Sequence, residues 1–219
     1  MSEARSELLS TIRASLGLPK AALEIPRNYR LETGAPDLIA LLEERIADYR
    51  AQVHLCFASE LPQTIAGILE RLGVTRLAIP ADLPADWIPV NLEILIDRAD
   101  LEPRHLETAG AVLTGCAVAI AETGTIVLDH AQAQGRRALT LIPDRHICVV
   151  FAAQIVDNLP TAISRLTDSV TAGRPLTFIS GPSATSDIEL NRVEGVHGPR
   201  VLEVVIVAVQ VPKHLEARQ

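Results

Sequence analysis

Hydrophobic residues recur at helical spacing near the start of the chain. Residues 2–16 place four apolar side chains on one side of a short helix, Leu8, Leu9, Ile12 and Leu16. Gly17 and Pro19 are expected to end that helix, and the proline-dotted stretch 19–36 predicts an extended linker. We therefore predict an N-terminal helical arm and linker over residues 1–35. Two interpretations of the arm stay open, packing on a partner subunit or free motion.

Beyond the linker, helical and strand patterns alternate along the chain. Helices are predicted over 37–52, 61–72, 103–108 and 152–169, and strands over 53–57, 76–79, 92–96, 147–151, 176–179 and 201–209, with two or three short strands inside 112–128. Strands that are apolar throughout and separated by helices indicate a mostly parallel sheet covered on both faces. The fold class expected is a three-layer α/β/α domain over residues 36–212, followed by a tail over 213–219.

The amino-acid composition indicates which classes of ligand the protein could bind. Hydrophobic residues make up 48% of the 219 residues, charged residues 21% and aromatic residues 3%, with a formal net charge of −7. An acidic chain with few aromatic residues disfavours nucleic-acid binding, which uses basic patches or base stacking. A small anionic ligand stays compatible, because one arginine or one helix N-terminus can bind it.

The cysteines argue against a cofactor held by this chain. Cys56, Cys116 and Cys148 form no CxxC pair and are odd in number, which disfavours an iron–sulfur cluster, a zinc site or a disulfide framework. Reduced, partly buried thiols are the simpler interpretation. The N-terminus lacks a secretory pattern and no apolar run could span a bilayer, so a cytoplasmic location is expected.

A polar loop follows the strand predicted at 176–179. Its candidate ligand-binding residues are Ser180, Gly181, Pro182, Ser183, Thr185, Asp187 and Glu189. Gly181 allows a sharp turn, and Ser183 is expected to cap a helix whose first turns hold the two acidic residues. Backbone N–H groups in such a turn suit a phosphate or carboxylate. The alternative is a structural serine-rich cap.

A second loop, residues 195–200, precedes the last strand and contains His197, Gly198 and Arg200. Arg200 could bind a carboxylate or phosphate with two parallel hydrogen bonds, and His197 could move a proton near neutral pH. Alternatively, Arg200 pairs with Asp187 or Glu189 and joins the two loops.

A third loop lies between two predicted strands and contains Glu122, Thr123, Gly124 and Thr125. Glu122 is a candidate general base or carboxylate nucleophile, with its neighbours as ligand-binding residues. A structural glutamate in a tight turn is the alternative. The chain has no GxGxxG, GxxxxGK or GxSxG motif, so standard dinucleotide, P-loop and α/β-hydrolase chemistry lack support.

Three separated motifs together resemble the LUD domain family. They are residues 121–128 (AETGTIVL), residues 180–183 (SGPS) with Thr185, Asp187, Ile188 and Glu189, and residues 195–200 (GVHGPR). The resemblance covers roughly residues 36–210. It implies a fold similar to CoA-transferase, ribose-5-phosphate isomerase and formyltetrahydrofolate cyclo-ligase domains.

The resemblance also implies a function. Members of the family are required for growth on L-lactate and act beside two iron–sulfur proteins, the set converting lactate to pyruvate. This chain lacks cluster-binding cysteines, so the clusters are expected on the partners. If lactate binds here, Arg200 would bind its carboxylate, and His197 or Glu122 would take the hydroxyl proton. A free-standing enzyme acting on a phosphorylated or CoA-linked metabolite, or a non-catalytic metabolite sensor, are the alternatives.

Overall fold

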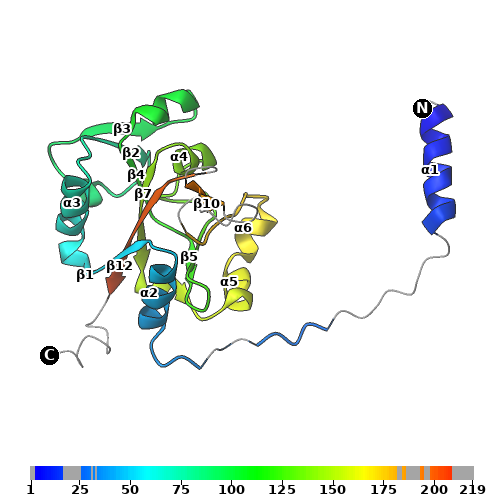
Figure 1. Cartoon of the computed structure of the whole chain (residues 1–219), viewed down its shortest axis with the longest axis horizontal. Helices are drawn as coiled ribbons and strands as arrows, with labels where there is room; N and C mark the ends of the chain where they lie inside the picture. The colour runs from blue at the N-terminus through cyan, green and yellow to red at the C-terminus, as the bar shows by residue number, and fades with distance from the viewer. Residues whose placement is uncertain are drawn as a thin grey trace.

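A central sheet of six parallel strands forms the body of the protein (Figure 1). The computed structural model describes residues 3–16, 26–30, 32, 34–181, 184–185, 193–194 and 198–208. In spatial order the strands are β1 (Gln52–Phe57), β12 (Val201–Ala208), β7 (Arg145–Phe151), β4 (Ala111–Thr114), β2 (Arg76–Pro80) and β3 (Glu93–Asp97). Each pairing between neighbours is parallel. The expected parallel sheet of apolar strands is therefore confirmed.

A second, four-stranded sheet packs on one face of the first. Its order is β8 (Ile155–Val156), β5 (Val118–Ile120), β6 (Thr125–Leu128) and β9 (Thr177–Ile179). The β5–β6 and β6–β9 pairs are antiparallel, and β5–β8 is parallel. The sequence predicted short strands here but not their separation into a second sheet, because period-2 patterns do not say which strands pair.

Three layers follow from how the helices pack. Helix α3 (Leu61–Arg71) covers one face of the six-stranded sheet and forms a core with Leu77, Ile147 and Val205. The other face is covered by α2 (Leu38–Asp48) and the second sheet, and, nearer β2 and β4, by α4 (Arg137–Leu141). Helices α5 (Leu159–Arg165) and α6 (Thr167–Thr171) lie outside the second sheet (Figure 1). The structure is consistent with the expected three-layer α/β fold.

Short 3₁₀ segments connect several of these elements. They are η1 (Ala58–Glu60), η2 (Ala85–Trp87), η3 (Pro103–Thr108) and η4 (Ala152–Gln154). The predicted helix over 152–169 is wrong in its first part, which η4 and β8 occupy, and is confirmed in its second part by α5 and the start of α6. Helix α5 begins only after Asn158, whose side chain accepts a hydrogen bond from the Thr161 N–H at 3.2 Å. Pro160 fits the first turn, where its missing N–H costs nothing.

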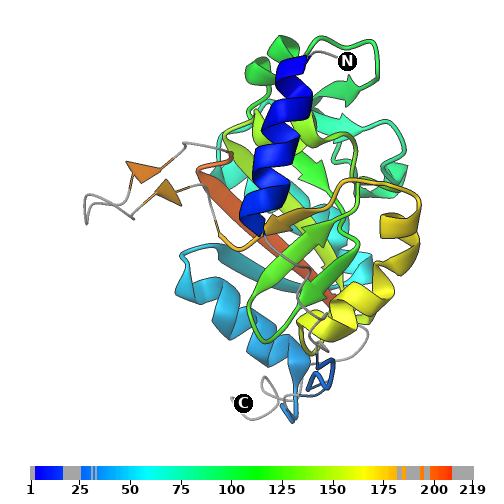
Figure 2. The ribbon, with the colours of Figure 1, turned by 90° about the vertical axis from the view of Figure 1, so that its right-hand side faces the viewer.

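The polar loop after β9 also differs from expectation. Ala184–Thr185 and Val193–Glu194 form a short antiparallel ladder, β10 and β11, where a helix capped by Ser183 was expected. Figure 2 shows these two strands projecting to one side of the two sheets. The backbone pairing there is extended, so the proposed anion site at a helix N-terminus has no helix at residues 184–185.

Helix α1 (Glu3–Leu16) confirms the amphipathic segment predicted for the arm. None of its residues is buried, and Leu8 and Leu16 are 62% and 75% exposed. Figure 1 shows it apart from the layered body. In the part of the chain that the structure describes, no helix combines the length and apolarity needed to cross a membrane.

Candidate functional site

The turn between β5 and β6 is built around Gly124. Its φ of +67° favours glycine, and a Cβ there would lie 2.9 Å from the backbone carbon of Arg45 in α2. Tyr49, just after α2, donates a hydrogen bond from its Oη to the Gly124 carbonyl at 2.7 Å. Glycine is therefore required where the turn meets α2.

Two of the predicted loops meet beside this tyrosine. Thr125 Oγ1 lies 2.9 Å from Ser180 Oγ, and Thr123 Oγ1 donates to Thr125 Oγ1 at 2.8 Å. A Cβ on Gly181 would lie 3.3 Å from the Tyr49 ring. The hydroxyl cluster, defined as Thr123, Thr125 and Ser180, thus gathers predicted site residues from two loops. Its hydroxyls bond to one another, which fixes the end of β9 against the turn.

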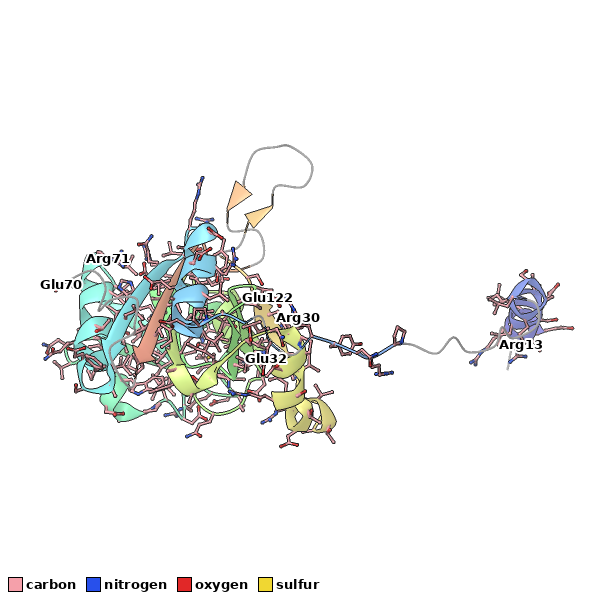
Figure 3. The ribbon with its side chains drawn as sticks, turned by 90° about the horizontal axis from the view of Figure 1, so that it is seen from below. Arg13, Arg30, Glu32, Glu70, Arg71 and Glu122 are labelled. Atoms are coloured by element: carbon pink, nitrogen blue, oxygen red, sulfur yellow. The ribbon has the colours of Figure 1, made fainter. Side chains whose placement is uncertain are left out.

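Glu122 is partnered by an arginine of the N-terminal segment. Its carboxylate forms an ion pair with the Arg30 guanidinium (Figure 3). The Arg30 carbonyl also accepts a hydrogen bond from Asn158 Nδ2 at 2.8 Å. Residues 26–30 are thereby joined to the second sheet and to the start of α5. In this arrangement Glu122 must exchange Arg30 for a substrate before it could act as a base.

Arg200 immediately precedes β12 and lies beside Asp144, the residue before β7. Its backbone N–H donates to the Asp144 carbonyl at 2.8 Å, and its guanidinium lies 3.7 Å from the Asp144 carboxylate. The side chain is 57% exposed. Gly198 is the neighbouring described motif residue. Pro182, Ser183, Asp187, Glu189 and His197 lie outside the described residues, and Thr185 is described only as part of β10.

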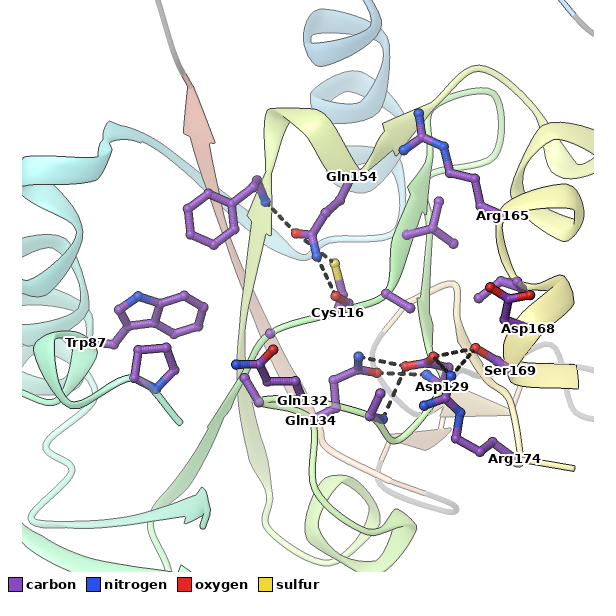
Figure 4. A pocket seen from close by; sticks show the side chains of 18 residues that line it. Trp87, Cys116, Asp129, Gln132, Gln134, Gln154, Arg165, Asp168, Ser169 and Arg174 are labelled. Atoms are coloured by element: carbon purple, nitrogen blue, oxygen red, sulfur yellow. Dashed lines mark hydrogen bonds and ion pairs between the residues drawn. The ribbon is translucent and has the colours of Figure 1, made fainter. Parts of the chain in front are cut away.

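A separate cavity of about 520 Å³ opens near the carboxyl ends of β4 and β7 (Figure 4). In open α/β sheets ligands bind at the carboxyl ends of strands. Pro84, Trp87 and Phe151 form its apolar wall, and the Trp87 and Phe151 ring centroids are 5.6 Å apart. The residues predicted for the site from sequence do not line it.

Asp129 organises the polar end of this cavity. Its carboxylate accepts hydrogen bonds from Ser169 Oγ at 2.5 Å, Gln134 Nε2 at 2.8 Å and the Ala131 N–H at 3.2 Å, and Arg174 Nη2 lies 3.2 Å away. Burial raises the pKa of Asp129, but the hydrogen bonds and the arginine outweigh it, so the pKa lies below its usual value. The carboxylate is therefore ionised and its charge is balanced.

The loop after β6 is held in an uncommon backbone conformation. His130 and Ala133 have φ values of 56° and 59°, and Gly135 has 68°. A non-glycine residue in the left-handed region costs free energy and is enriched at functional sites. His130 Nδ1 lies 2.9 Å from the Gly135 carbonyl oxygen, and the Asp129 N–H donates to Gln134 Oε1 at 2.7 Å. These bonds maintain the loop as a rigid wall of the cavity.

The inner wall is fixed by Gln154. Its Nε2 donates to the Cys116 carbonyl at 2.5 Å, and its Oε1 accepts from the Phe151 N–H at 2.8 Å. A hydrogen bond with the Cys148 thiol, together with burial, raises the pKa of Cys116 well above its usual value. Cys116 is therefore a neutral thiol and a poor nucleophile. Among the described residues, no group of three or more His, Cys, Asp and Glu side chains is placed to bind a metal ion.

Sequence reasoning missed this cavity because its polar residues belong to no recognised motif. They come from the β6–α4 loop and from the α5–α6 region, which are distant in sequence. One signal was available. Residues 129–137 (DHAQAQGRR) form a dense polar run directly after an apolar strand, and such loops at strand ends often carry ligand-binding residues.

The comparisons with known proteins identify the family. The LUD domain model matches residues 39–207. This chain therefore belongs to the LUD domain family.

Several relatives support the assignment. A protein of Deinococcus radiodurans named lactate utilization protein C is 47% identical over 205 residues, covering 94% of this chain and 96% of that protein. A lactate utilization protein C of Bacillus subtilis is 30% identical over 143 residues, covering 64% of this chain and 58% of that protein. A crystal structure of a DUF162 family protein from Deinococcus radiodurans matches with a TM-score of 0.68 and 47% identity, covering 78% of this chain and 96% of that one.

Proposed function

We propose that this chain is a component of an L-lactate utilization system and supports the oxidation of L-lactate to pyruvate together with iron–sulfur partner proteins. The observation that carries the proposal is the 47% identity, over nearly the whole of both chains, to the Deinococcus protein named for lactate utilization. The family membership and the order of the three loop motifs point the same way.

Oxidation of L-lactate to pyruvate removes two electrons and two protons, and both must have a destination. The cysteines Cys56, Cys116 and Cys148 are buried and lie on or beside different strands. We assign the electrons to clusters held by the partner proteins and the substrate-binding or assembly role to this chain.

The exposed stripe of α1 supports a partner-binding role. Leu8, Leu9, Ile12 and Leu16 are all exposed, although they form the apolar side of an amphipathic helix. A helix with an unburied apolar side is stabilised when that side packs on another protein. We propose that α1 contacts an iron–sulfur partner.

The loop residues keep the roles proposed for them. Arg200 would exchange the exposed carboxylate of Asp144 for the lactate carboxylate, since an ion pair at 3.7 Å between exposed groups contributes little stability. Glu122 or His197 would take the hydroxyl proton. Arg200→Ala should then abolish lactate-dependent activity in a folded chain, whereas Arg104→Gln, at an exposed ion pair with Glu102, should not.

The direct test is reconstitution. L-lactate-dependent dye reduction is measured for a mixture of this chain and its two candidate iron–sulfur partners, with each component omitted in turn. Loss of activity when only this chain is left out supports a place in the oxidising complex. Unchanged activity without it contradicts a direct role in lactate oxidation and favours the metabolite-enzyme or sensor alternatives.

A further inference from the structure

The cavity near the carboxyl ends of β4 and β7 has more room than lactate needs. Its volume of about 520 Å³ lies within the range of about 300–1,000 Å³ typical of sites for cofactor-sized ligands. A three-carbon acid would leave most of this space to water. The size therefore points to a larger ligand, distinct from the substrate of the proposed function.

The two ends of the cavity differ in chemistry. Figure 4 shows Trp87 at one end and Arg174, Ser169 and Asp129 at the other. Trp87 and Phe151 provide a tilted aromatic pair with an interplanar angle of 39°. A planar ring packs well on such a wall, because aromatic faces and edges attract one another.

Two arginines line the same side of the cavity, Arg174 beside Asp129 and Ser169, and Arg165 nearer Gln154 (Figure 4). Arg174 already bonds to Ser169 and Asp129, and Arg165 donates one hydrogen bond to the Ala153 carbonyl at 2.7 Å. A guanidinium carries five N–H donors, so these bonds leave others for a ligand. Of the two lining carboxylates, Asp129 is balanced by Arg174, and Asp168 is exposed to solvent that screens its charge.

The lining also includes three amide side chains, Gln132, Gln134 and Gln154. Gln132 is exposed, and the loop that carries it has its backbone fixed by the Asp129 and Gln134 hydrogen bonds. Amide side chains donate and accept, which suits the edge of a heterocyclic base. Because the loop that carries Gln132 is already ordered, binding a ligand there costs less conformational entropy.

We propose that this cavity binds a nucleoside phosphate, with the base against Trp87 and Phe151 and the phosphate on Arg165 and Arg174. The occupant is one class of ligand, a planar heterocycle joined to a phosphate. A free nucleotide and a nucleotide-containing cofactor share that chemistry. The site is independent of the hydroxyl cluster and of Arg200, so it adds a second ligand to the proposed function.

The chain offers a built-in reporter, because Trp87 is its one tryptophan. The purified chain is titrated with AMP, ATP, coenzyme A, inorganic phosphate and L-lactate, while Trp87 emission and binding heat are recorded. We expect at least one nucleotide-containing probe to change the emission and to bind saturably, with inorganic phosphate much weaker. AMP or ATP binding separates a free nucleotide from a cofactor bound only as coenzyme A.

Two variants locate the site. Arg165→Met removes a guanidinium that has no part in the Asp129 network, and it should weaken binding by about 10- to 100-fold. Arg174→Gln should do the same, with circular dichroism to check the fold. Arg104→Gln, at a residue that does not line the cavity, should bind like the parent chain. Because the test uses this chain alone, its result is separate from that of the reconstituted lactate assay.

Three results would overturn the proposal. The first is no emission change and no heat with any nucleotide-containing probe at millimolar concentration. The second is saturable binding that both Arg165→Met and Arg174→Gln leave unchanged. The third is an emission change with L-lactate that matches or exceeds that of the nucleotides, which would make the cavity the substrate site instead.

Discussion

The hydroxyl oxygen of Thr125 lies 2.9 Å from that of Ser180, although the two residues are 55 positions apart in sequence. Thr125 begins β6 and Ser180 follows β9, so the antiparallel pairing of these strands creates the contact. Thr125 is buried, which removes competition from water. This hydrogen bond therefore connects two loops whose motifs are separate in the sequence.

A double-mutant cycle tests the hydrogen bond between Thr125 and Ser180. Thr125→Val and Ser180→Ala each remove one hydroxyl, and the free energies of unfolding in urea are compared for both single variants and the double variant. We expect a coupling energy of about 0.5–1.5 kcal/mol, as for a hydrogen bond between neutral groups. A coupling near zero would contradict a stable bond between the two loops.

Gly124→Ala should destabilise the chain more than the same change at another left-handed glycine. At Gly124 the added methyl group meets Arg45 atoms at 2.9 Å, in addition to the strain of a φ of +67°. Gly73 has φ +64° with nothing within 4 Å, so Gly73→Ala measures the backbone strain alone. We expect about 1 kcal/mol at Gly73 and about 2–4 kcal/mol at Gly124 by urea unfolding. Equal losses would contradict the close packing of the turn on α2.

Glu122→Gln and Arg30→Gln separate two roles of Glu122. If the ion pair only attaches residues 26–30 to the second sheet, both variants should reduce lactate-dependent activity to a similar, small extent. If Glu122 takes a proton from the substrate, Glu122→Gln should lose activity by about 100-fold or more while Arg30→Gln keeps most of it. The reconstituted dye assay distinguishes the two patterns. Full activity of Glu122→Gln would remove the base role.

The main elements were predictable from sequence, and the cavity was not. The apolar run of β12 indicates a strand buried on both faces, and the one-sided pattern of α3 indicates a helix buried on one face. A helix was predicted over 152–169 although Ile155 and Val156 form strand β8. That strand is stabilised by pairing with β5, which is distant in sequence, so the local pattern does not show it.

Some residues of the candidate sites were predictable from sequence, and others were not. Gly124, Thr125 and Ser180 were each named as candidate site residues, because they lie in polar loops beside strand ends, but their contact across two loops was not predicted. Trp87 and Arg174 lie far apart in the sequence and line one cavity only after the two sheets have packed. No local pattern encodes that proximity, so it required the structure.

The pH dependence of stability should contain a contribution from His146. This residue is buried in β7, its Nε2 lies 2.8 Å from Thr114 Oγ1, and burial lowers its pKa to about 4. Between that value and the ordinary histidine pKa of about 6.5, the unfolded chain binds a proton that the folded chain does not. Stability should therefore be fully present above about pH 6.5 and fall by about 3 kcal/mol as the pH drops to about 4.

The measurement is urea unfolding at a series of pH values for the parent chain and for His146→Leu, with the exposed His105→Gln as the control. His146→Leu should lose most of the slope between about pH 4 and 6.5, whatever its stability at neutral pH, and His105→Gln should keep it. Asp129 and Glu203 have lowered pKa values, so their contributions begin to be lost near their unfolded pKa values of about 4, at the acidic end of this window. Both residues are present in the parent chain and in the two variants, so the comparison of slopes isolates the contribution of His146. An unchanged slope in His146→Leu would show that the imidazole is protonated inside the folded protein, contrary to its burial between β4 and β12.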